Sequence, residues 1–141
     1  MTEASSILLK NCRVVDAETN SVSASKNILV EQDRITQIGD EIVVPKNVTE
    51  IDIDARFVMP GLIDCHVHPF LADSNIARLS DVPPTLMSAR AGNILSGMLQ
   101  RGFTTVRDAA GADWGIKRAV EEGEIIGPRL FIAGRALSQT G

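Results

Sequence analysis

The sequence predicts an α/β protein in which a β-rich segment, residues 1–58, precedes a series of parallel β/α units, residues 59–141. Two observations predict this organisation. Apolar residues alternate at period two in the first segment, which is typical of strands with one buried face. After the Pro60-Gly61 corner, short apolar runs alternate with two helical patterns, and strands separated by helices pair in parallel through right-handed crossovers.

The β-rich segment consists of apolar runs joined by polar turns. Residues 6–16 form the first run, and a polar, turn-rich stretch follows at 18–25. Residues 27–39 alternate on both sides of a turn at 32–33, and the alternation returns at 48–58. Short alternating strands of this kind predict a small antiparallel sheet with one buried face.

In the second segment the spacing of apolar residues alternates between that of strands and that of helices. Leu86, Ala89, Leu95, Met98 and Leu99 form an apolar stripe that predicts a helix, and Gly102 ends it. In order, the expected elements are a strand at 61–68, a proline-rich loop at 69–84, a helix at 85–101, a strand at 103–111, a short helix that ends near 123 and a strand at 128–134.

Composition excludes several classes of protein. Fourteen basic and eighteen acidic residues give a net charge of −4, which argues against a surface for nucleic acid or an anionic membrane. The start of the sequence lacks the pattern of a secretory signal, and no apolar run approaches the ~20 residues of a membrane span. Cys12 and Cys65 lie far apart, so we expect reduced thiols in a cytoplasmic protein.

The two histidines of the chain, His66 and His68, are separated by one residue at the end of a predicted strand. Residues i and i+2 of a strand share a face, so both imidazoles, with Asp64 below them, should project together. Ligands of parallel β/α arrays bind at the carboxyl ends of the strands. Two imidazoles there predict a metal site, with ligand distances of ~2.0–2.1 Å for zinc. The alternative is a pair of partly exposed loop histidines with no shared role.

Three stretches of sequence resemble a known family. FVMPGLIDCHVHPF, residues 57–70, resembles the amidohydrolase superfamily signature, in which a β-sandwich leads into the first strand of a TIM barrel. LQRGFTTVRDAAGADW and GPRLFIAGRALSQTG are similar to the imidazolonepropionase-like branch, which includes metal-dependent dipeptidases of the prolidase type. The resemblance implies the first three β/α units of a (β/α)8 TIM barrel preceded by part of a small β-sandwich. Such a barrel takes roughly 250 residues, so the chain is expected to be an N-terminal fragment.

The resemblance also implies a function. His66 and His68 take the place of the family's first-strand metal ligands, and one or two divalent ions, zinc foremost, would activate a water. The remaining ligands and the acid/base group are expected beyond Gly141. The implied reaction is hydrolysis of an amide C–N bond in dipeptides or N-acyl amino acids, by a protein that is a homo-oligomer when intact. Two alternatives are a hydrolase of cyclic amides of the imidazolone or hydantoin type, and a non-catalytic relative that uses the scaffold for assembly.

Other residues allow a functional or a structural interpretation. Asp64 could accept a hydrogen bond from a histidine ligand or hold the strand in place. Asp108 ends the second barrel strand, where it could face the pocket, pair with Arg107 or cap a helix. Trp114 is expected to pack rather than to contact substrate, and Cys65 to point away from the histidines. The loop at 135–140 is expected to be solvated rather than to line the pocket.

Overall fold

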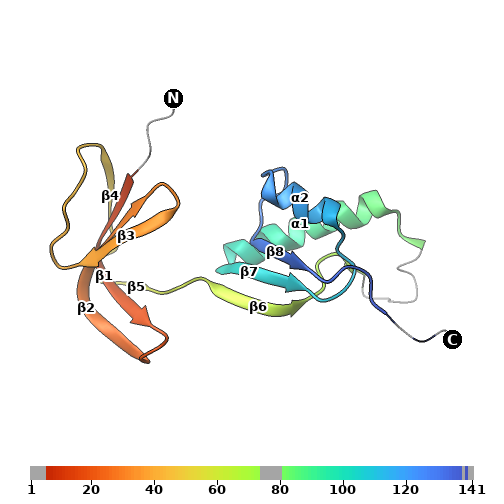
Figure 1. Cartoon of the computed structure of the whole chain (residues 1–141), viewed down its shortest axis with the longest axis horizontal. Helices are drawn as coiled ribbons and strands as arrows, with labels where there is room; N and C mark the ends of the chain where they lie inside the picture. The colour runs from red at the N-terminus through yellow and green to blue at the C-terminus, as the bar shows by residue number, and fades with distance from the viewer. Residues whose placement is uncertain (1–5, 74–80, 138, 140–141) are drawn as a thin grey trace. The chain divides into compact units, whose positions relative to one another are not determined.

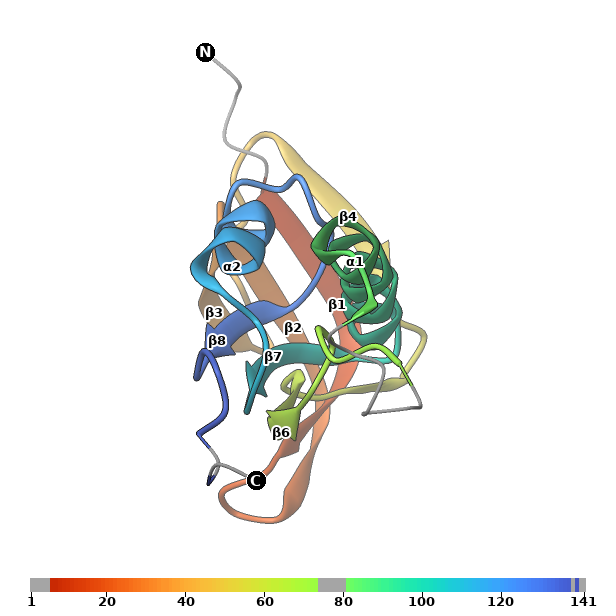
Figure 2. The same ribbon diagram turned by 90° about the vertical axis from the view of Figure 1, so that its right-hand side faces the viewer.

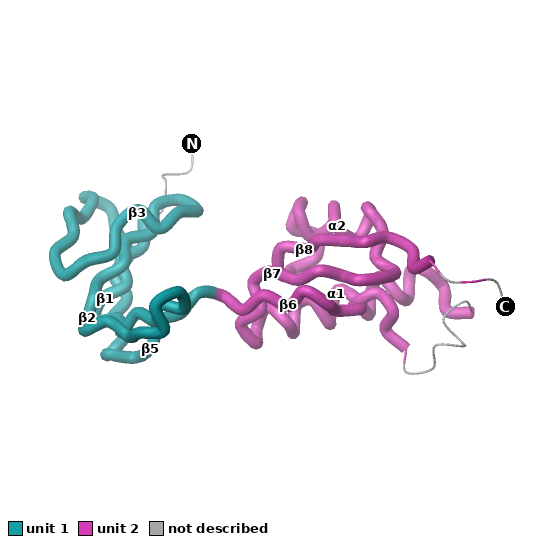
Figure 3. Tube along the Cα trace, turned by 60° about the horizontal axis from the view of Figure 1, so that its bottom comes forward, with its two compact units in different colours: residues 1–60 teal, residues 61–141 magenta. Residues whose placement is uncertain are grey.

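A computed structural model describes residues 6–73, 81–137 and 139 of the chain. The chain divides into two compact units, Met1–Pro60 and Gly61–Gly141 (Figure 3). The division falls within the Pro60-Gly61 corner, two residues after the boundary expected from the loss of strand alternation. Residues 74–80 of the expected proline-rich loop lie outside the described residues.

The first unit is one five-stranded sheet (Figure 1). Its strands are β1 (Ser6–Asp16), β2 (Ser21–Glu31), β3 (Arg34–Gly39), β4 (Val48–Asp52) and β5 (Phe57–Val58). The order is β3-β2-β1-β4, with β5 also paired to β1. The hairpins β1–β2 and β2–β3 are antiparallel, but β4 and β5 run parallel to β1. The expectation of a wholly antiparallel sheet was therefore wrong, because alternation reports which side chains are buried and not the direction in which a strand pairs.

A bulge in β1 ties this sheet together. The pairing of β1 with β2 shifts register between Leu9 and Cys12, and Asn11 in the bulge has φ 57°. Its amide donates to both carboxylate oxygens of Asp52 on β4, at 3.0 and 3.1 Å. These hydrogen bonds are the leading reason that the pKa of Asp52 lies below its ordinary value. Asparagine tolerates the left-handed backbone that the bulge needs, so the sequence meets both requirements at one position.

The second unit places two helices on one face of a three-stranded parallel sheet (Figures 1 and 2). Its elements are β6 (Leu62–Val67), α1 (Pro84–Gln100), β7 (Phe103–Asp108), α2 (Trp114–Glu121) and β8 (Arg129–Ile132). The sheet order is β6-β7-β8, and both pairings are parallel. The predicted strand–helix–strand–helix–strand order is confirmed, with helix and strand ends within a few residues of the expected positions.

The core of this unit lies between the sheet and the helices. Its buried members are Ala91, Leu95, Met98, Val106, Ala112, Ile116 and Leu130. Leu86 and Ala89 are exposed, so the predicted stripe of α1 was wrong in its first half. The buried residues of α1 are Ala91, Leu95 and Met98, whose spacings of four and three place them on one helix face.

The opposite face of the sheet is open. Ile63 on β6 and Phe131 on β8 are 66% and 53% exposed. No helix of the described ranges covers them.

Gly61 allows β6 to start close beside β7. A Cβ atom at this position would lie 2.0 Å from Oγ1 of Thr104, far inside contact distance. Leu62 then donates its backbone N–H to the carbonyl of Gly102 at 2.8 Å, and pairing with β7 begins. The glycine of the Pro60-Gly61 corner thus positions the strand that carries the histidines.

Candidate metal centre

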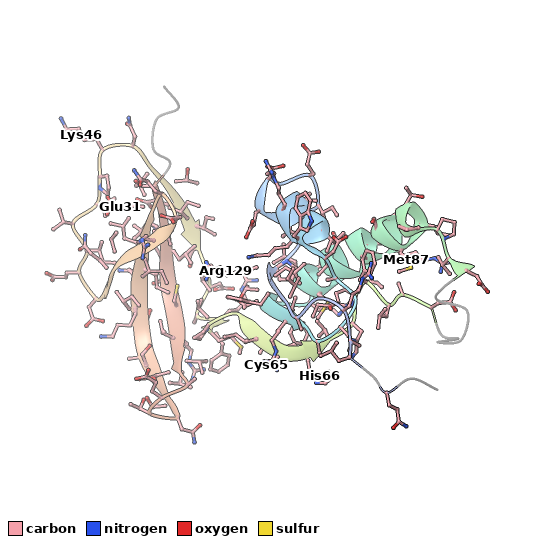
Figure 4. All side chains as sticks on the ribbon, turned by 45° about the vertical axis from the view of Figure 1, so that its right-hand side comes forward. Glu31, Lys46, Cys65, His66, Met87 and Arg129 are labelled. Carbon is pink, nitrogen blue, oxygen red and sulfur yellow. The ribbon has the colours of Figure 1, made fainter. Side chains whose placement is uncertain are left out.

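His66 and His68 lie at the carboxyl end of β6, the first strand of the parallel sheet. The strand ends at Val67, whose side chain packs against the helix-covered core. Because neighbouring strand residues point to opposite faces, the histidines on either side of Val67 project towards the open face. Figure 4 labels Cys65 and His66 on this strand.

The two imidazole rings converge. Their Nε2 atoms are 3.2 Å apart, and the ring centroids lie 5.1 Å apart at an interplanar angle of 77°. This distance shows that the two rings lie close together, as the shared strand face predicted, and their sharing of one metal ion stays a prediction. Two nitrogens separated in this way can each reach one ion at ~2.1 Å with an angle of about 100° between the bonds, close to the tetrahedral angle of a zinc site. The pair therefore fits two adjacent ligand positions of one metal ion.

A backbone carbonyl favours one tautomer of the neutral His68 ring. Nδ1 of this ring lies 3.4 Å from the carbonyl oxygen of Ala110, in the loop after β7. A carbonyl oxygen has no proton to give, so Nδ1 must donate, and the neutral ring then has a bare Nε2. That is the tautomer that a metal ligand needs. His66 donates to this bare nitrogen through its own Nε2, so binding of an ion requires His66 to give up that proton or move it to Nδ1.

Asp64 holds the backbone of the strand and not a histidine ring. Three steps of β6 from Asp64 to Val67 pair with two steps of β7, which makes a bulge between them. Oδ1 of Asp64 accepts a hydrogen bond from the backbone N–H of His66 at 3.0 Å within this bulge. The period-two argument that placed Asp64 on the histidine face fails here, because a bulge breaks the alternation.

Asp108, the last residue of β7, is completely buried. Its Oδ1 accepts a hydrogen bond from the backbone N–H of Ala112 at 3.1 Å, and its Oδ2 has no hydrogen-bond partner within the described part of the chain. Burial raises the pKa of this carboxyl, while the N–H groups of Ala112 and Phe70, and the positive charge of His68 when that ring is protonated, act in the opposite direction. Carboxylate and histidine are thus close enough to interact.

Two of the structural roles considered for Asp108 are wrong. Arg107 donates its Nε–H to the carbonyl of Cys65 at 2.8 Å, with no ion pair to Asp108 in the described structure. The cap of α2 is Asp113, whose Oδ1 accepts from the N–H groups of Gly115 and Ile116. The carboxylate of Asp108 instead closes a turn in the loop between β7 and α2.

The described residues supply two metal donors and no more. Among residues 6–73, 81–137 and 139, no group of three or more histidine, cysteine, aspartate or glutamate side chains is arranged to hold an ion. Catalytic zinc sites use about three protein ligands and an open position for water. If His66 and His68 bind an ion, they supply two of the ligands that such a site needs.

A cavity of about 530 Å³ opens beside this end of the sheet. Phe70, Met87, Trp114 and Ile132 form its apolar wall, and Arg135 and Asp113 contribute a positive and a negative charge. Trp114 is 72% exposed, so the expectation that it packs in the interior was wrong. It starts α2 at the carboxyl end of the sheet, and the helical periodicity alone did not reveal that position. Residues 138 and 140 of the following loop lie outside the described residues.

Comparison with known proteins places the chain in a family. The model of the amidohydrolase family matches residues 57–140, which include β6, both helices and the two histidines. The chain belongs to the amidohydrolase family. Members of this family use divalent metals, and the paired imidazoles of this amidohydrolase are suited to bind one.

Three similar proteins illustrate the relationship. Ochratoxinase of Aspergillus niger is 34% identical over 120 residues, which are 79% of this chain and 25% of that protein. Imidazolonepropionase of Vibrio cholerae is 37% identical over 79 residues, 53% of this chain and 20% of that protein. A crystal structure of a prolidase complexed with N-methylphosphonate-L-proline superposes with a TM-score of 0.90 and 40% identity, over 95% of this chain and 33% of that one.

This amidohydrolase chain thus spans a quarter to a third of the length of the ochratoxinase and of the prolidase. The structural relatives are TIM-barrel amidohydrolases, and the parallel β6-β7-β8 sheet with its two helices aligns with them. Neither described helix is long and apolar enough to cross a bilayer.

Proposed function

We propose that the protein is a metal-dependent hydrolase of amide C–N bonds, with dipeptides or N-acyl amino acids as substrates and zinc as the metal. The separation of 3.2 Å between the Nε2 atoms of His66 and His68, at the carboxyl end of a parallel strand, carries the proposal. It is the spacing of two ligands on one ion, and this end of a β/α array is where reacting groups gather. The three β/α strands would form the start of a TIM barrel.

In this mechanism the residues of the chain bind and orient. A divalent ion lowers the pKa of a bound water to about 7 and polarises the scissile carbonyl. Nε2 of His66 and Nε2 of His68 would hold the ion, and the carbonyl of Ala110 keeps the proton of His68 on Nδ1. The bulge fixed by Asp64 sets the backbone that presents His66.

A cavity at the carboxyl end of the same sheet, whose lining includes neither histidine, would accept a substrate with an apolar group and a negative charge. Trp114, Phe70 and Met87 offer an apolar wall, and the guanidinium of Arg135 would pair with the carboxylate of a dipeptide or N-acyl amino acid. The ochratoxinase and prolidase relatives are further support for amide substrates of this kind.

The test uses the full-length protein and a substrate panel. Metal is removed with a chelator, zinc is restored, and hydrolysis of Xaa-Pro dipeptides, other dipeptides and N-acyl amino acids is measured. We expect hydrolysis that depends on metal and falls at least about a hundredfold in His66→Ala and in His68→Ala, because each removes one ligand.

Cys65→Ala is the matched control. It changes the residue next to His66 without touching either imidazole, and it should retain activity. Full activity in both histidine variants would contradict the proposal, and absence of hydrolysis with any substrate despite tight zinc binding would favour a non-catalytic relative.

A second candidate substrate class is a cyclic amide of the imidazolone or hydantoin type. The identity of 37% to imidazolonepropionase favours it. The same assay distinguishes the two classes when hydantoin and imidazolone substrates are added to the panel. A preference for these rings over dipeptides, with the same loss in His66→Ala, would identify the cyclic-amide activity.

A further inference from the structure

The loop between β7 and α2 connects a buried carboxylate to one of the proposed metal ligands. Oδ1 of Asp108 accepts from the N–H of Ala112 at 3.1 Å, which closes a turn over Ala109, Ala110 and Gly111. The carbonyl of Ala110, in the middle of that turn, accepts from Nδ1 of His68 at 3.4 Å. One hydrogen bond thus fixes the turn, and the turn presents the acceptor to the histidine.

The rest of the loop is anchored at both ends. The N–H of Ala109 donates to the carbonyl of Val67 at 2.9 Å, which attaches the loop to the strand that carries the histidines. The N–H of Gly111 donates to the carbonyl of Gly134 at 2.8 Å, and the N–H of Ala133 to the carbonyl of Asp108 at 3.0 Å. Gly111 has φ 110°, where a Cβ atom would lie 2.8 Å from Leu71, so the turn is also tightly packed.

This arrangement does not resemble a simple structural cap. Asp113 is such a cap: it is exposed, and its Oδ1 accepts from the N–H groups of Gly115 and Ile116 at the start of α2. It has no hydrogen bond to a histidine within the described residues. Asp108 has no exposed surface, and its Oδ2 lacks a hydrogen-bond partner in the described ranges. A buried carboxylate with an unsatisfied oxygen is costly, so its presence calls for a structural or functional reason.

We propose that Asp108 is a positioning residue of the metal site, whose carboxylate fixes the turn so that the carbonyl of Ala110 keeps the proton of His68 on Nδ1 and leaves Nε2 bare for the ion. The inference rests on the proposed function, since it takes His68 as a metal ligand. Asp108 itself touches neither substrate nor metal. In this proposal its effect passes through the backbone of Ala110 and Ala112. The direct interaction between its charge and a protonated His68 is the competing route, which the Asp108→Asn variant tests.

The test compares three variants of the full-length protein. Asp108→Asn retains an oxygen that accepts from Ala112 but removes the charge. Asp108→Ala removes the acceptor. Asp108→Ser leaves a polar group on a shorter side chain, which should weaken the hydrogen bond to the N–H of Ala112. Asp113→Ala is the matched control, because it removes a comparable side-chain acceptor at the next cap without affecting Ala110.

Two readouts are used. Nuclear magnetic resonance of isotope-labelled histidine in the metal-free protein reports which ring nitrogen of His68 is protonated, with His68→Gln to assign the signal. Competition with a chromophoric chelator reports zinc affinity. Asp108→Ala and Asp108→Ser should lose the Nδ1–H preference and bind zinc about 10- to 100-fold more weakly, the usual effect of removing a group that orients a ligand. Asp108→Asn and Asp113→Ala should retain both properties.

Several results would overturn the inference. Unchanged tautomer and affinity in Asp108→Ala would do so, as would an equal loss in Asp113→Ala. An equal loss in Asp108→Asn would mean that the charge acts on His68 directly. If thermal unfolding shows that neither loss variant folds, Asp108 serves the fold and not the site. The proposed function fails if His66→Ala and His68→Ala leave zinc affinity unchanged. The tautomer of His68 is measured without metal, so it tests the role of Asp108 even in that case.

Discussion

His66 and His68 are held by different parts of the second unit. The ring of His68 contacts the loop after β7, and the backbone of His66 is fixed by Asp64 within β6. Sequence spacing predicted the shared face of the rings, because the separation of two residues is local. It did not predict the carbonyl of Ala110, which lies 42 residues further along the chain. The partner that sets the tautomer of a ligand is thus decided by tertiary structure.

The two cysteines are predicted to react very differently. Cys12 is completely buried on β1 and Cys65 is exposed on β6. Burial, and to a smaller extent the charge of Asp52, raises the pKa of the Cys12 thiol above its ordinary value of 9.0. Alkylation of the native protein at pH 8, followed by mass spectrometry, should modify Cys65 at least about tenfold faster than Cys12.

The pH dependence of Cys12 follows from its raised pKa. A thiol whose pKa is raised by folding favours the folded state below its unfolded pKa, and this contribution is lost as pH rises through the folded pKa. The protection of Cys12 should therefore weaken above pH 9 and not in acid. Equal labelling of both cysteines at pH 8 would contradict the burial of Cys12.

At the scale of elements, some glycines are needed because a neighbouring element lies too close for a side chain, and others are not. Gly61 lies against Thr104 of β7, with no room for a Cβ atom. A Cβ atom added at Gly92, in the middle of α1, would lie 3.7 Å from the side chain of Ile125, which is an ordinary contact distance. The same residue type is therefore required at one position and dispensable at the other, and the sequence alone does not distinguish them.

Substitution of these glycines should change stability in opposite directions. Gly61→Ala forces β6 and β7 apart and should lower the free energy of unfolding by about 1–3 kcal/mol, the cost of overpacking. Gly92→Ala replaces a poor helix former without a clash and should raise it by about 0.5–1 kcal/mol. Urea denaturation of both variants beside the parent protein measures the two changes. A neutral Gly61→Ala would show that β6 does not start against Thr104.

At the scale of the whole molecule, the parallel sheet is covered on one face and open on the other. Ile63 and Phe131 are exposed on the open face, and the outer edges of β6 and β8 have no neighbouring strand among the described residues. Large exposed apolar side chains on a parallel sheet are unusual, because such sheets are ordinarily buried on both faces. This is the side of the sheet towards which the histidines project.

The 141-residue chain by itself should bind zinc weakly and hydrolyse none of the proposed amide substrates. Two imidazoles leave an ion without a third protein ligand, and an open sheet face gives no dry cavity for the reaction. Calorimetric titration with zinc, assays on dipeptides and N-acyl amino acids, and a light-scattering measurement of aggregation at the open strand edges check this expectation. Metal-dependent hydrolysis that disappears in His66→Ala would show that the chain alone forms a working site.

The sequence by itself determined the order of elements, the division at Pro60-Gly61 and the convergence of the two imidazoles. These depend on hydrophobic period, turn residues and a separation of two positions, all of which act locally. Tertiary structure decided that β4 and β5 run parallel to β1, that a bulge removes Asp64 from the histidine face, and that Asp108 closes the turn beside His68. The strand pairings and the bulge depend on partners distant in sequence. The turn at Asp108 is local, but its hydrogen bond goes to a backbone N–H, which every residue type except proline offers, so the identity of residue 112 gives no signal of it.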